Sequence, residues 1–290
     1  MTSDGEAHED AITGEEIAGT VSPASPASIS TPNAFAQLMS NSKRAFNSPS
    51  STPPPKRIAN SHPSFFGSAG LGIYLQNPSA QPASRVIFHT ESFVAINDLY
   101  PKSSVHTLLI ARERKWHTMH PIAALSDPGF LELARPQVEK LKGIVASELR
   151  RKYGPYSAQD KEREKVLSGE VELDVDADLP KGRNWEDEVM VGIHMHPSME
   201  HLHIHVLSVD RYSECMKKRN HYNSFATPFF VRFSEFPLSE ERKEELERKG
   251  QGRRWIEADL KCWRCGERFG NKFARLKEHL EQEFGTWKML

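Results

Sequence analysis

The sequence has few cysteines, only 3 among 290 residues. That number excludes the disulfide framework of a small secreted domain and favours a reducing compartment. No run approaches the ~20 apolar residues that a membrane-spanning helix needs. The acidic opening, MTSDGEAHEDAITGEE, lacks the apolar segment of a secretory signal. Charge of one sign is not in excess either, because the formal net charge is −1, so bulk charge indicates no class of partner.

Large apolar side chains are scarce in residues 1–60, where Ser, Thr, Pro, Ala and Asn dominate. Such a segment cannot bury enough apolar surface to offset the loss of chain entropy, so we expect a disordered tail. Two Lys-Arg pairs, in NSKRAF and PPPKRIA, match short nuclear-import signals. Ordinary solvated charges in a flexible tail explain the same pairs equally well.

From residue 61 to residue 212 the sequence has the pattern of a folded α+β domain. Short apolar runs between turn residues predict strands of an antiparallel sheet, and apolar residues at helical spacing predict two helices. The strands are expected at 86–88, 93–96, 106–110, 189–193 and 201–206, and the helices at 67–76 and 127–153. The acidic stretch 155–184 has few core residues, so we expect it to lie on the surface as an insertion.

A row of histidines marks the last of these strands. His201, His203 and His205 alternate with apolar residues in the segment HLHIHV. Because strand side chains alternate between two faces, the histidines share one face and the apolar residues pack on the core. Imidazole titrates near neutral pH, so three can supply a nucleophile, a proton donor and a phosphate anchor. The alternatives are structural histidines or a metal site, although the strand has no carboxylate or cysteine to complete a typical ligand set. Among the other histidines, His106 is expected to be structural and His196 to face solvent.

The C-terminal region contains a second motif, between residues 262 and 283. Cys262 and Cys265 are followed by thirteen residues and then by His279, which has the spacing of a zinc finger. On a helix, His279 and Glu283 stand at i and i+4, so both can face one ion, and a carboxylate oxygen is an accepted zinc ligand. We therefore predict one structural zinc bound by these four residues. The alternative is a pair of ordinary thiols before a solvated helix.

The remainder of this region, residues 213–290, is basic. Between Arg248 and Lys277 there are ten Lys and Arg against three Asp and Glu, an excess that the near-zero net charge hides. A module ordered by zinc would display these side chains to nucleic-acid phosphates, with backbone contacts in preference to base readout. The predicted DNA contacts are Lys217, Lys218, Arg219, Arg264, Arg268, Lys272, Arg275 and Lys277.

Several of these segments together resemble a known family. GIHMHPSMEHLHIHVLSVD and the earlier VIFHTESFVAINDLYPKSSVHTLLIARE resemble the histidine-triad (HIT) superfamily of nucleotidyl hydrolases and transferases. With KKRNHYNSFATPFF and the Cys-x2-Cys tail, residues 64–290 are similar to the aprataxins, deadenylases that repair abortive DNA ligation. The resemblance implies a five-stranded antiparallel sheet, two main helices and a C-terminal zinc finger. Nothing in residues 1–60 resembles the FHA domain of larger members, so the chain resembles the shorter forms.

The resemblance also implies a reaction. The substrate would be DNA with an adenylated 5′ end, at a nick or an RNA–DNA junction, and AMP would be a product. His203 would attack the α-phosphorus and form a covalent AMP-histidine that water then hydrolyses. His205 would face the nonbridging oxygens, His194 would assist the leaving phosphate, and His201 would orient the nucleophile through backbone hydrogen bonds. A phosphate leaving group needs little from a general acid, so no catalytic metal is expected.

The resemblance further assigns residues to substrate binding. Those for phosphate and nucleotide are Lys102, Ser198, Asp98, Leu71, Ile96 and Leu99. Asp98 would lie near the ribose, whereas Leu71 and Ile96 are explained equally well as core residues. Phe65 and Phe66 would stack on a terminal base pair, or else would staple the first helix.

Three functions account for parts of this pattern. A DNA 5′-adenylate hydrolase with a DNA-gripping finger accounts for both motifs. A HIT-type hydrolase of small adenosine phosphoramidates or dinucleoside polyphosphates would need no basic finger. A non-enzymatic zinc-finger DNA-binding protein would leave the histidine triad unexplained. The first function implies a monomer, a nuclear location with the cytoplasm as the alternative, and no contact with a membrane.

Overall fold

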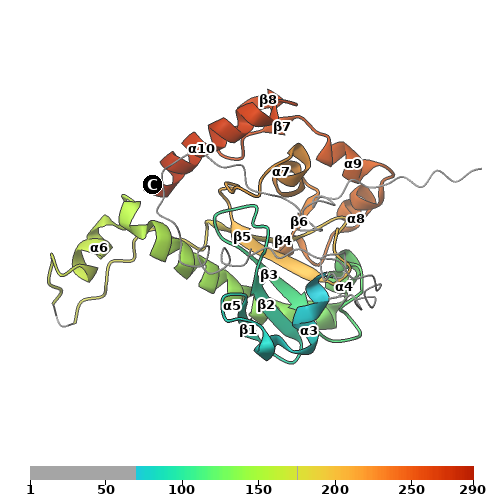
Figure 1. Cartoon of the computed structure of the whole chain (residues 1–290), viewed down its shortest axis with the longest axis horizontal. Helices are drawn as coiled ribbons and strands as arrows, with labels where there is room; N and C mark the ends of the chain where they lie inside the picture. The colour runs from blue at the N-terminus through green and yellow to red at the C-terminus, as the bar shows by residue number, and fades with distance from the viewer. Residues whose placement is uncertain (1–69, 175) are drawn as a thin grey trace, which may run out of the picture.

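The computed structural model describes residues 70–174 and 176–290 (Figure 1). The predictions for residues 1–60, Phe65 and Phe66 lie outside this range. Within this range, an antiparallel sheet packs against one long helix (Figure 1), and buried residues of the C-terminal region, among them Trp255 and Trp287, belong to the same core cluster. No helix among the described residues is long and apolar enough to cross a membrane.

The sheet has the strand order β1-β2-β3-β5-β4-β6, and every neighbouring pair is antiparallel. The prediction of five strands is wrong by one, because β6 adds a sixth beside β4. Sequence patterning misses β6 because three residues are too few to show alternation, and its pairing with β4 alone identifies it. The strands are β1 (Val86–His89), β2 (Phe93–Asn97), β3 (His106–Ala111), β4 (Val189–His194), β5 (His203–Ser208) and β6 (Phe230–Arg232).

Both predicted helices are present. The first is a 3-10 turn, η1 (Gly70–Gly72), that continues into α3 (Ile73–Gln76). The second is α5 (Pro128–Tyr153), which begins where the Asp127 carboxylate accepts hydrogen bonds from two backbone amides and which contains Pro136. The other helical segments are η2 (Pro78–Ala80), α4 (Pro121–Ser126), η3 (Gly154–Tyr156), α6 (Lys161–Leu167), α7 (Arg219–Ala226), η4 (Phe233–Glu235), α8 (Glu240–Glu247), α9 (Gln251–Ile256) and α10 (Phe273–Met289).

The two faces of the sheet have different partners. Leu202, Ile204 and Val206 share one buried cluster with the apolar face of α5. The side chains of His203 and His205 therefore lie on the opposite face, since strand residues alternate. That face carries a second apolar cluster of Leu71, Val94, Ile96, Leu108 and Ile110, and Leu108 and Ile110 pair in register with His205 and His203. The alternation in the sequence thus separates a core face from a face that carries the histidines.

The C-terminal region packs as a small unit against α7. Its strands, β7 (Leu260–Lys261) and β8 (Arg268–Gly270), form a two-stranded hairpin that lies beside α10. A buried cluster joins Leu260, Cys262, Leu276 and Leu280 to Tyr222 of α7. The Tyr222 hydroxyl donates to the Lys261 carbonyl and accepts from the Trp263 amide, which ties the hairpin to α7.

The acidic stretch 155–184 is only partly the surface excursion that we expected. It contains α6 and projects from the body of the molecule (Figure 1), and residues 167–174 are exposed. Its base is different, because Ser157, Asp160 and Arg183 are buried. Sequence patterning misses this base since polar side chains form it and their partners are distant in the chain.

Candidate active site and zinc centre

The predicted nucleophile, His203, is buried at the beginning of β5, with 4% of its surface exposed. Its Nδ1 lies 2.8 Å from the His201 carbonyl oxygen. A carbonyl oxygen can only accept a hydrogen bond, so Nδ1 carries the proton and Nε2 keeps its lone pair. Burial lowers the pKa of His203 below its ordinary value, which favours this neutral form. The His201 carbonyl thus makes the backbone contact that the resemblance implies.

A chain of hydrogen bonds fixes the protonation of His205. The backbone amide of Lys102 donates to Nδ1 of His106 at 3.0 Å, so the proton of neutral His106 is on Nε2. Nε2 of His106 lies 3.0 Å from Nδ1 of His205, which must therefore accept. Burial lowers the pKa of His106 to about 4 and keeps that ring neutral. The remaining nitrogen of His205, Nε2, is consequently the one that carries a hydrogen.

His194 and His205 lie side by side next to the nucleophile. Their ring centroids are 4.5 Å apart, and the rings of His203 and His205 are 4.8 Å apart. Nε2 of both His194 and His205 is buried and has no hydrogen-bond partner in the part of the chain that the structure describes. Burial, with smaller contributions from neighbouring histidines, holds the pKa of both well below the ordinary value. Unpaired buried nitrogens are rare, and here they adjoin a buried nucleophile, so they indicate a ligand with hydrogen-bonding oxygens.

His106 was expected to be structural, and its hydrogen bond with His205 gives it a second role, which is to set the protonation of that ring. It is the first residue of β3 and lies on the histidine face of the sheet. Asp98 Oδ2 lies 3.3 Å from Nδ1 of His106, so the predicted ribose contact stays a prediction. Donor atoms of Asp98, His106 and His205 lie within 4.8 Å of one another. The described contacts already use both nitrogens of His106, which makes this group a hydrogen-bond chain in preference to a metal site.

The loop that carries Lys102 is held from the far end of β5. Asp210 is buried, and its carboxylate accepts from the Ser104 amide at 2.9 Å and from the Ser104 hydroxyl at 3.1 Å. The Lys102 ammonium is itself buried and donates to the Tyr100 carbonyl at 2.9 Å. Its charge contributes to the lowered pKa of both His194 and His205, after burial and other histidines. Asp210 could not be predicted from the sequence, because a lone Asp after a strand has no distinguishing pattern.

The residues predicted to line an adenosine pocket are only partly brought together. Leu71 and Ile96 are buried in one cluster on the histidine face, and Tyr74 and Leu75 of α3 pack against it. Gly72 lies against His201, because a Cβ added at Gly72 would be 3.1 Å from the imidazole ring. Leu99 is 41% exposed and lies outside that cluster, and Ser198 is half-buried in the connection between β4 and β5. The first helix is therefore adjacent to the triad.

The predicted zinc ligands meet between the β7–β8 hairpin and α10. Donor atoms of Cys262, Cys265 and His279 lie within 4.8 Å of one another. Nε2 of His279 is 3.1 Å from the Cys265 sulfur and 3.5 Å from Oε1 of Glu283. Zinc bonds of about 2.3 Å to sulfur and about 2.0 Å to nitrogen put tetrahedral ligand atoms roughly 3.5 Å apart, so the spacing of Cys262, Cys265 and His279 fits one ion. Arg264 donates to the other Glu283 oxygen, Oε2, at 2.6 Å, and Glu283 is not in the group of three mutually close donor atoms, so its part as the fourth ligand stays a prediction.

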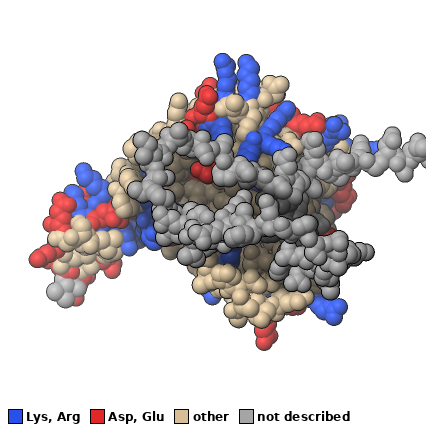
Figure 2. Space-filling view, in the orientation of Figure 1, with Lys and Arg blue, Asp and Glu red and all other residues tan. Residues whose placement is uncertain are grey.

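Most of the predicted DNA contacts are exposed. Basic side chains gather at the top of the view in Figure 2, over the region of β7, β8 and α10. The exposed ones among the predicted contacts are Lys217, Lys218, Arg268, Lys272, Arg275 and Lys277. Two others have structural contacts, since Arg264 pairs with Glu283 and Arg219 donates to the Ala258 carbonyl.

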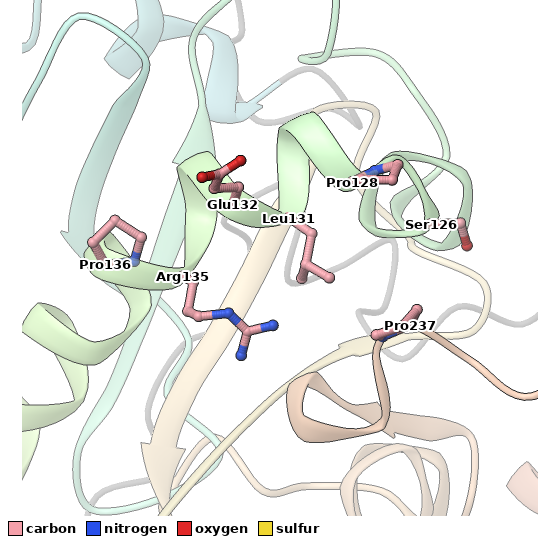
Figure 3. A pocket seen from close by; sticks show the side chains of 7 residues that line it. All are labelled: Ser126, Pro128, Leu131, Glu132, Arg135, Pro136 and Pro237. Carbon is pink, nitrogen blue, oxygen red and sulfur yellow. The ribbon is translucent and has the colours of Figure 1, made fainter.

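Two cavities lie outside the triad. A groove of about 1040 Å³ runs between α4, the end of β4 and α8–α9, and the exposed His196 lines it. A cavity of about 490 Å³ lies beside the first turns of α5, where Leu131 and Arg135 face Pro237 (Figure 3). This second cavity is on the helix side of the sheet, so it is separate from the histidine face. No triad histidine lines either of them.

Profiles of two known families match the chain. The profile described as "C2HE / C2H2 / C2HC zinc-binding finger" matches residues 226–286. The profile described as "Scavenger mRNA decapping enzyme C-term binding" matches residues 74–150 and 174–221. The first match contains all four candidate zinc ligands, and the second contains the histidine row and omits residues 151–173.

Known proteins resemble the chain over most of its described length. An aprataxin-like protein of Schizosaccharomyces pombe is 32% identical over 217 residues, which cover 75% of this chain and 81% of that protein. An aprataxin-like protein of Saccharomyces cerevisiae is also 32% identical, over 74% of this chain and 95% of that protein. The crystal structure of the aprataxin ortholog Hnt3 in complex with DNA is similar at a TM-score of 0.58 and 28% identity. The similar region covers 76% of this chain and 96% of the Hnt3 chain.

Proposed function

This chain belongs to the aprataxin family, and from that premise we propose that it removes AMP from 5′-adenylated DNA ends left by abortive ligation. Family membership makes it a DNA-repair hydrolase that acts on DNA ends. The finer proposal concerns the bond and the residues. The pyrophosphate link between AMP and the DNA 5′-phosphate would be hydrolysed in two steps, releasing AMP and a 5′-phosphate end.

The observation that carries the proposal is the protonation pattern of the triad. His203 donates through Nδ1 to a backbone carbonyl, so its Nε2 lone pair is available as a nucleophile. In the first step Nε2 attacks the α-phosphorus in line. The bond from that phosphorus to the bridging oxygen breaks, and the DNA 5′-phosphate leaves with the electron pair. The intermediate is AMP joined to Nε2 of His203.

Two hydrogen-bond donors support the charge that develops in this step. The relay from Lys102 through His106 puts the His205 proton on Nε2. That N–H is directed away from His106 and can reach the nonbridging oxygens of the α-phosphate. The unpaired Nε2 of His194 is suited to the leaving phosphate. The buried charge of Lys102 stabilises the negative charge on both the α-phosphate and the leaving phosphate. Ser198 and the Leu71–Ile96 cluster complete the proposed nucleotide site, with Asp98 and Leu99 beside the ribose and base.

Water completes the reaction in the second step. A water molecule attacks the phosphorus of the AMP-histidine, the P–N bond breaks, and the electron pair returns to Nε2 of His203. One proton of the water stays on the AMP phosphate or passes to solvent, AMP leaves, and the neutral imidazole is restored. The steps need no metal at the triad, because imidazole and lysine donors supply the stabilisation that a metal ion would otherwise give.

The C-terminal finger supports DNA as the substrate. Cys262, Cys265, His279 and Glu283 would hold zinc, which would stabilise the fold of the module. Its exposed lysines and arginines would contact the phosphates of the duplex. The solved Hnt3 complex contains DNA, and a second contains DNA and guanosine, at 28% identity to this chain. We further propose that the protein acts as a monomer in the nucleus, since its proposed substrate is nuclear DNA.

Single-turnover hydrolysis tests the proposal. A nicked duplex with a 5′-adenylate and a diadenosine polyphosphate would be compared as substrates for the wild type, His203→Ala and Cys262→Ser. We expect faster cleavage of the nick and its loss in His203→Ala. Cys262→Ser should weaken DNA binding more than hydrolysis. Acid quenching of the wild type should trap AMP on His203.

The alternative outcome would identify a small-nucleotide hydrolase. Faster cleavage of the dinucleotide, with no effect of Cys262→Ser, would contradict the DNA substrate and leave the triad chemistry intact. Full activity of His203→Ala would contradict the nucleophile itself. Gln282→Ala serves as the matched control for Cys262→Ser, because Gln282 is exposed in the same module.

A further inference from the structure

One helix connects the zinc centre to the catalytic domain. Helix α10 carries two candidate zinc ligands, His279 and Glu283, in its middle, and Phe284 and Trp287 follow within the same helix. Trp287 is 1% exposed and belongs to the large core cluster of the catalytic domain, not to that of the finger. Trp287 lies eight positions after His279, about 12 Å along the helix at 1.5 Å per residue, without a flexible linker.

Polar contacts hold the end of this helix. The Trp287 indole donates through Nε1 to Oε2 of Glu188 at 2.7 Å. Oε1 of the same carboxylate accepts a hydrogen bond from the Arg183 guanidinium at 2.7 Å. The Arg183 guanidinium also donates to the Trp287 carbonyl at 2.8 Å. It lies over two indole rings, 4.3 Å from the Trp185 centroid and 5.1 Å from the Trp287 centroid. A buried charge with this many partners defines one position for the helix end.

Aromatic packing surrounds these contacts. Tyr153, at the end of α5, contacts the rings of Trp185, Phe284 and Trp287 at centroid distances of 6.5, 5.5 and 5.6 Å. Tyr212 stacks on Phe284 at 4.5 Å with an interplanar angle of 18°. Large aromatic side chains supply much of the buried area in such contacts. The last turns of α10 are therefore part of the catalytic domain's core.

The base of the acidic insertion completes the joint. Asp160 accepts the Arg183 amide at 2.9 Å through Oδ1 and the Trp185 indole at 2.7 Å through Oδ2. Gly182 has φ +66, and a Cβ there would lie 1.9 Å from the Asp160 carboxylate, so this turn requires glycine. The backbone amides of Ala158 and Gln159 donate to the carbonyls of Met289 and Leu290, respectively. The insertion thus reaches α10 directly, although the decapping-enzyme profile omits residues 151–173.

We propose that Trp287 and Arg183 are positioning residues that fix the finger relative to the triad, so that a duplex held by the finger presents its 5′ end to His203. This inference rests on the proposed function. A rigid connection keeps the effective concentration of the 5′ end at the triad high once the finger is bound, whereas a loose connection lowers it. The ligand recognised across both parts is a duplex long enough to reach the finger, not the adenylate alone.

The test separates DNA engagement from chemistry. Full-length wild type, Trp287→Ala, Trp287→Phe and Gln282→Ala would be compared on a long 5′-adenylated nicked duplex and on a 5′-adenylated dinucleotide. We expect Trp287→Ala to raise KM for the duplex about tenfold to a hundredfold, which is part of the roughly 10²- to 10⁴-fold that linkage can contribute to avidity. Its kcat and KM on the dinucleotide should stay within about twofold of wild type, because the triad is untouched.

Conservative replacement and zinc content complete the design. Trp287→Phe keeps the aromatic ring and should recover most of the duplex KM, and Gln282→Ala, an exposed change on the same helix, should match wild type. Bound zinc, measured by native mass spectrometry, should remain at wild-type level in every variant. An unchanged duplex KM in Trp287→Ala would overturn the inference. So would equal losses on both substrates, which would indicate a general folding defect. Wild type that cleaves neither substrate would instead overturn the proposed function.

Discussion

Replacing His106 tests whether a hydrogen-bond relay sets the reactivity of the triad. His106→Phe removes the Nε2–H that reaches Nδ1 of His205 at 3.0 Å and keeps a ring of similar size. The edge contact with Phe225, at a centroid distance of 5.5 Å, can persist. His205 would then no longer be restricted to the form with its proton on Nε2, and part of the population would present a lone pair to the phosphate.

The magnitude follows from the bond that is lost. A neutral hydrogen bond contributes about 0.5–1.5 kcal/mol net, and 1.4 kcal/mol corresponds to a factor of ten in rate, so kcat should fall about two- to tenfold. Deleting the donor itself is more costly. His205→Ala should lower kcat about a hundred- to a thousandfold, the usual effect of removing one donor to a developing oxyanion.

The assay is single-turnover hydrolysis of a 5′-adenylated nick, with DNA affinity measured separately. Thr107→Val is the matched control, because it deletes a buried hydrogen bond of 2.7 Å to the Val206 carbonyl from the next residue of the same strand. It should lower stability without lowering kcat. A His106→Phe rate equal to that of His205→Ala would refute the relay, since His106 would then act on the substrate itself. An unchanged rate would refute it as well.

Further predictions concern pH, packing and zinc. Burial lowers the pKa of His203, and neutral imidazole is the reactive form, so kcat/KM should stay level as pH falls through the ordinary histidine value of about 6.5 and decline only below it. Burial also lowers the pKa of His221 to about 3, so between about pH 6.5 and 3 the unfolded chain binds a proton that the folded chain does not. The free energy of unfolding, measured with urea, should therefore fall as pH falls through that window, and His221→Asn should flatten the fall. Gly192→Ala should destabilise by about 1–3 kcal/mol, because its Cβ would lie 2.4 Å from a carbonyl oxygen of β6. Gly143→Ala, in α5 with nothing within 4 Å of the new Cβ, should not destabilise. Glu283→Gln should lower zinc affinity and DNA affinity and leave hydrolysis of an adenylated dinucleotide unchanged; retained zinc at wild-type affinity would exclude this carboxylate as a ligand.

Patterns that depend on neighbouring residues could be predicted from the sequence. The triad strand was predictable because side chains of a strand alternate with period two wherever that strand lies in the fold. The four candidate zinc ligands were predictable because a hairpin with two cysteines and a helix with ligands at i and i+4 are local structures. Both of the predicted helices are present for the same reason. The strand β6 was missed because three residues carry too little pattern.

Only the tertiary structure determined the contacts that connect these parts. His106 and His205 are 99 residues apart, as are Glu188 and Trp287, and Ser104 and Asp210 are 106 apart. No local period relates such pairs. Local patterns in the sequence therefore predicted which face of β5 carries the imidazoles and which residues would bind zinc. The protonation of His205, the anchoring of the Lys102 loop and the attachment of α10 depend on hydrogen bonds that exist only when distant segments are packed together.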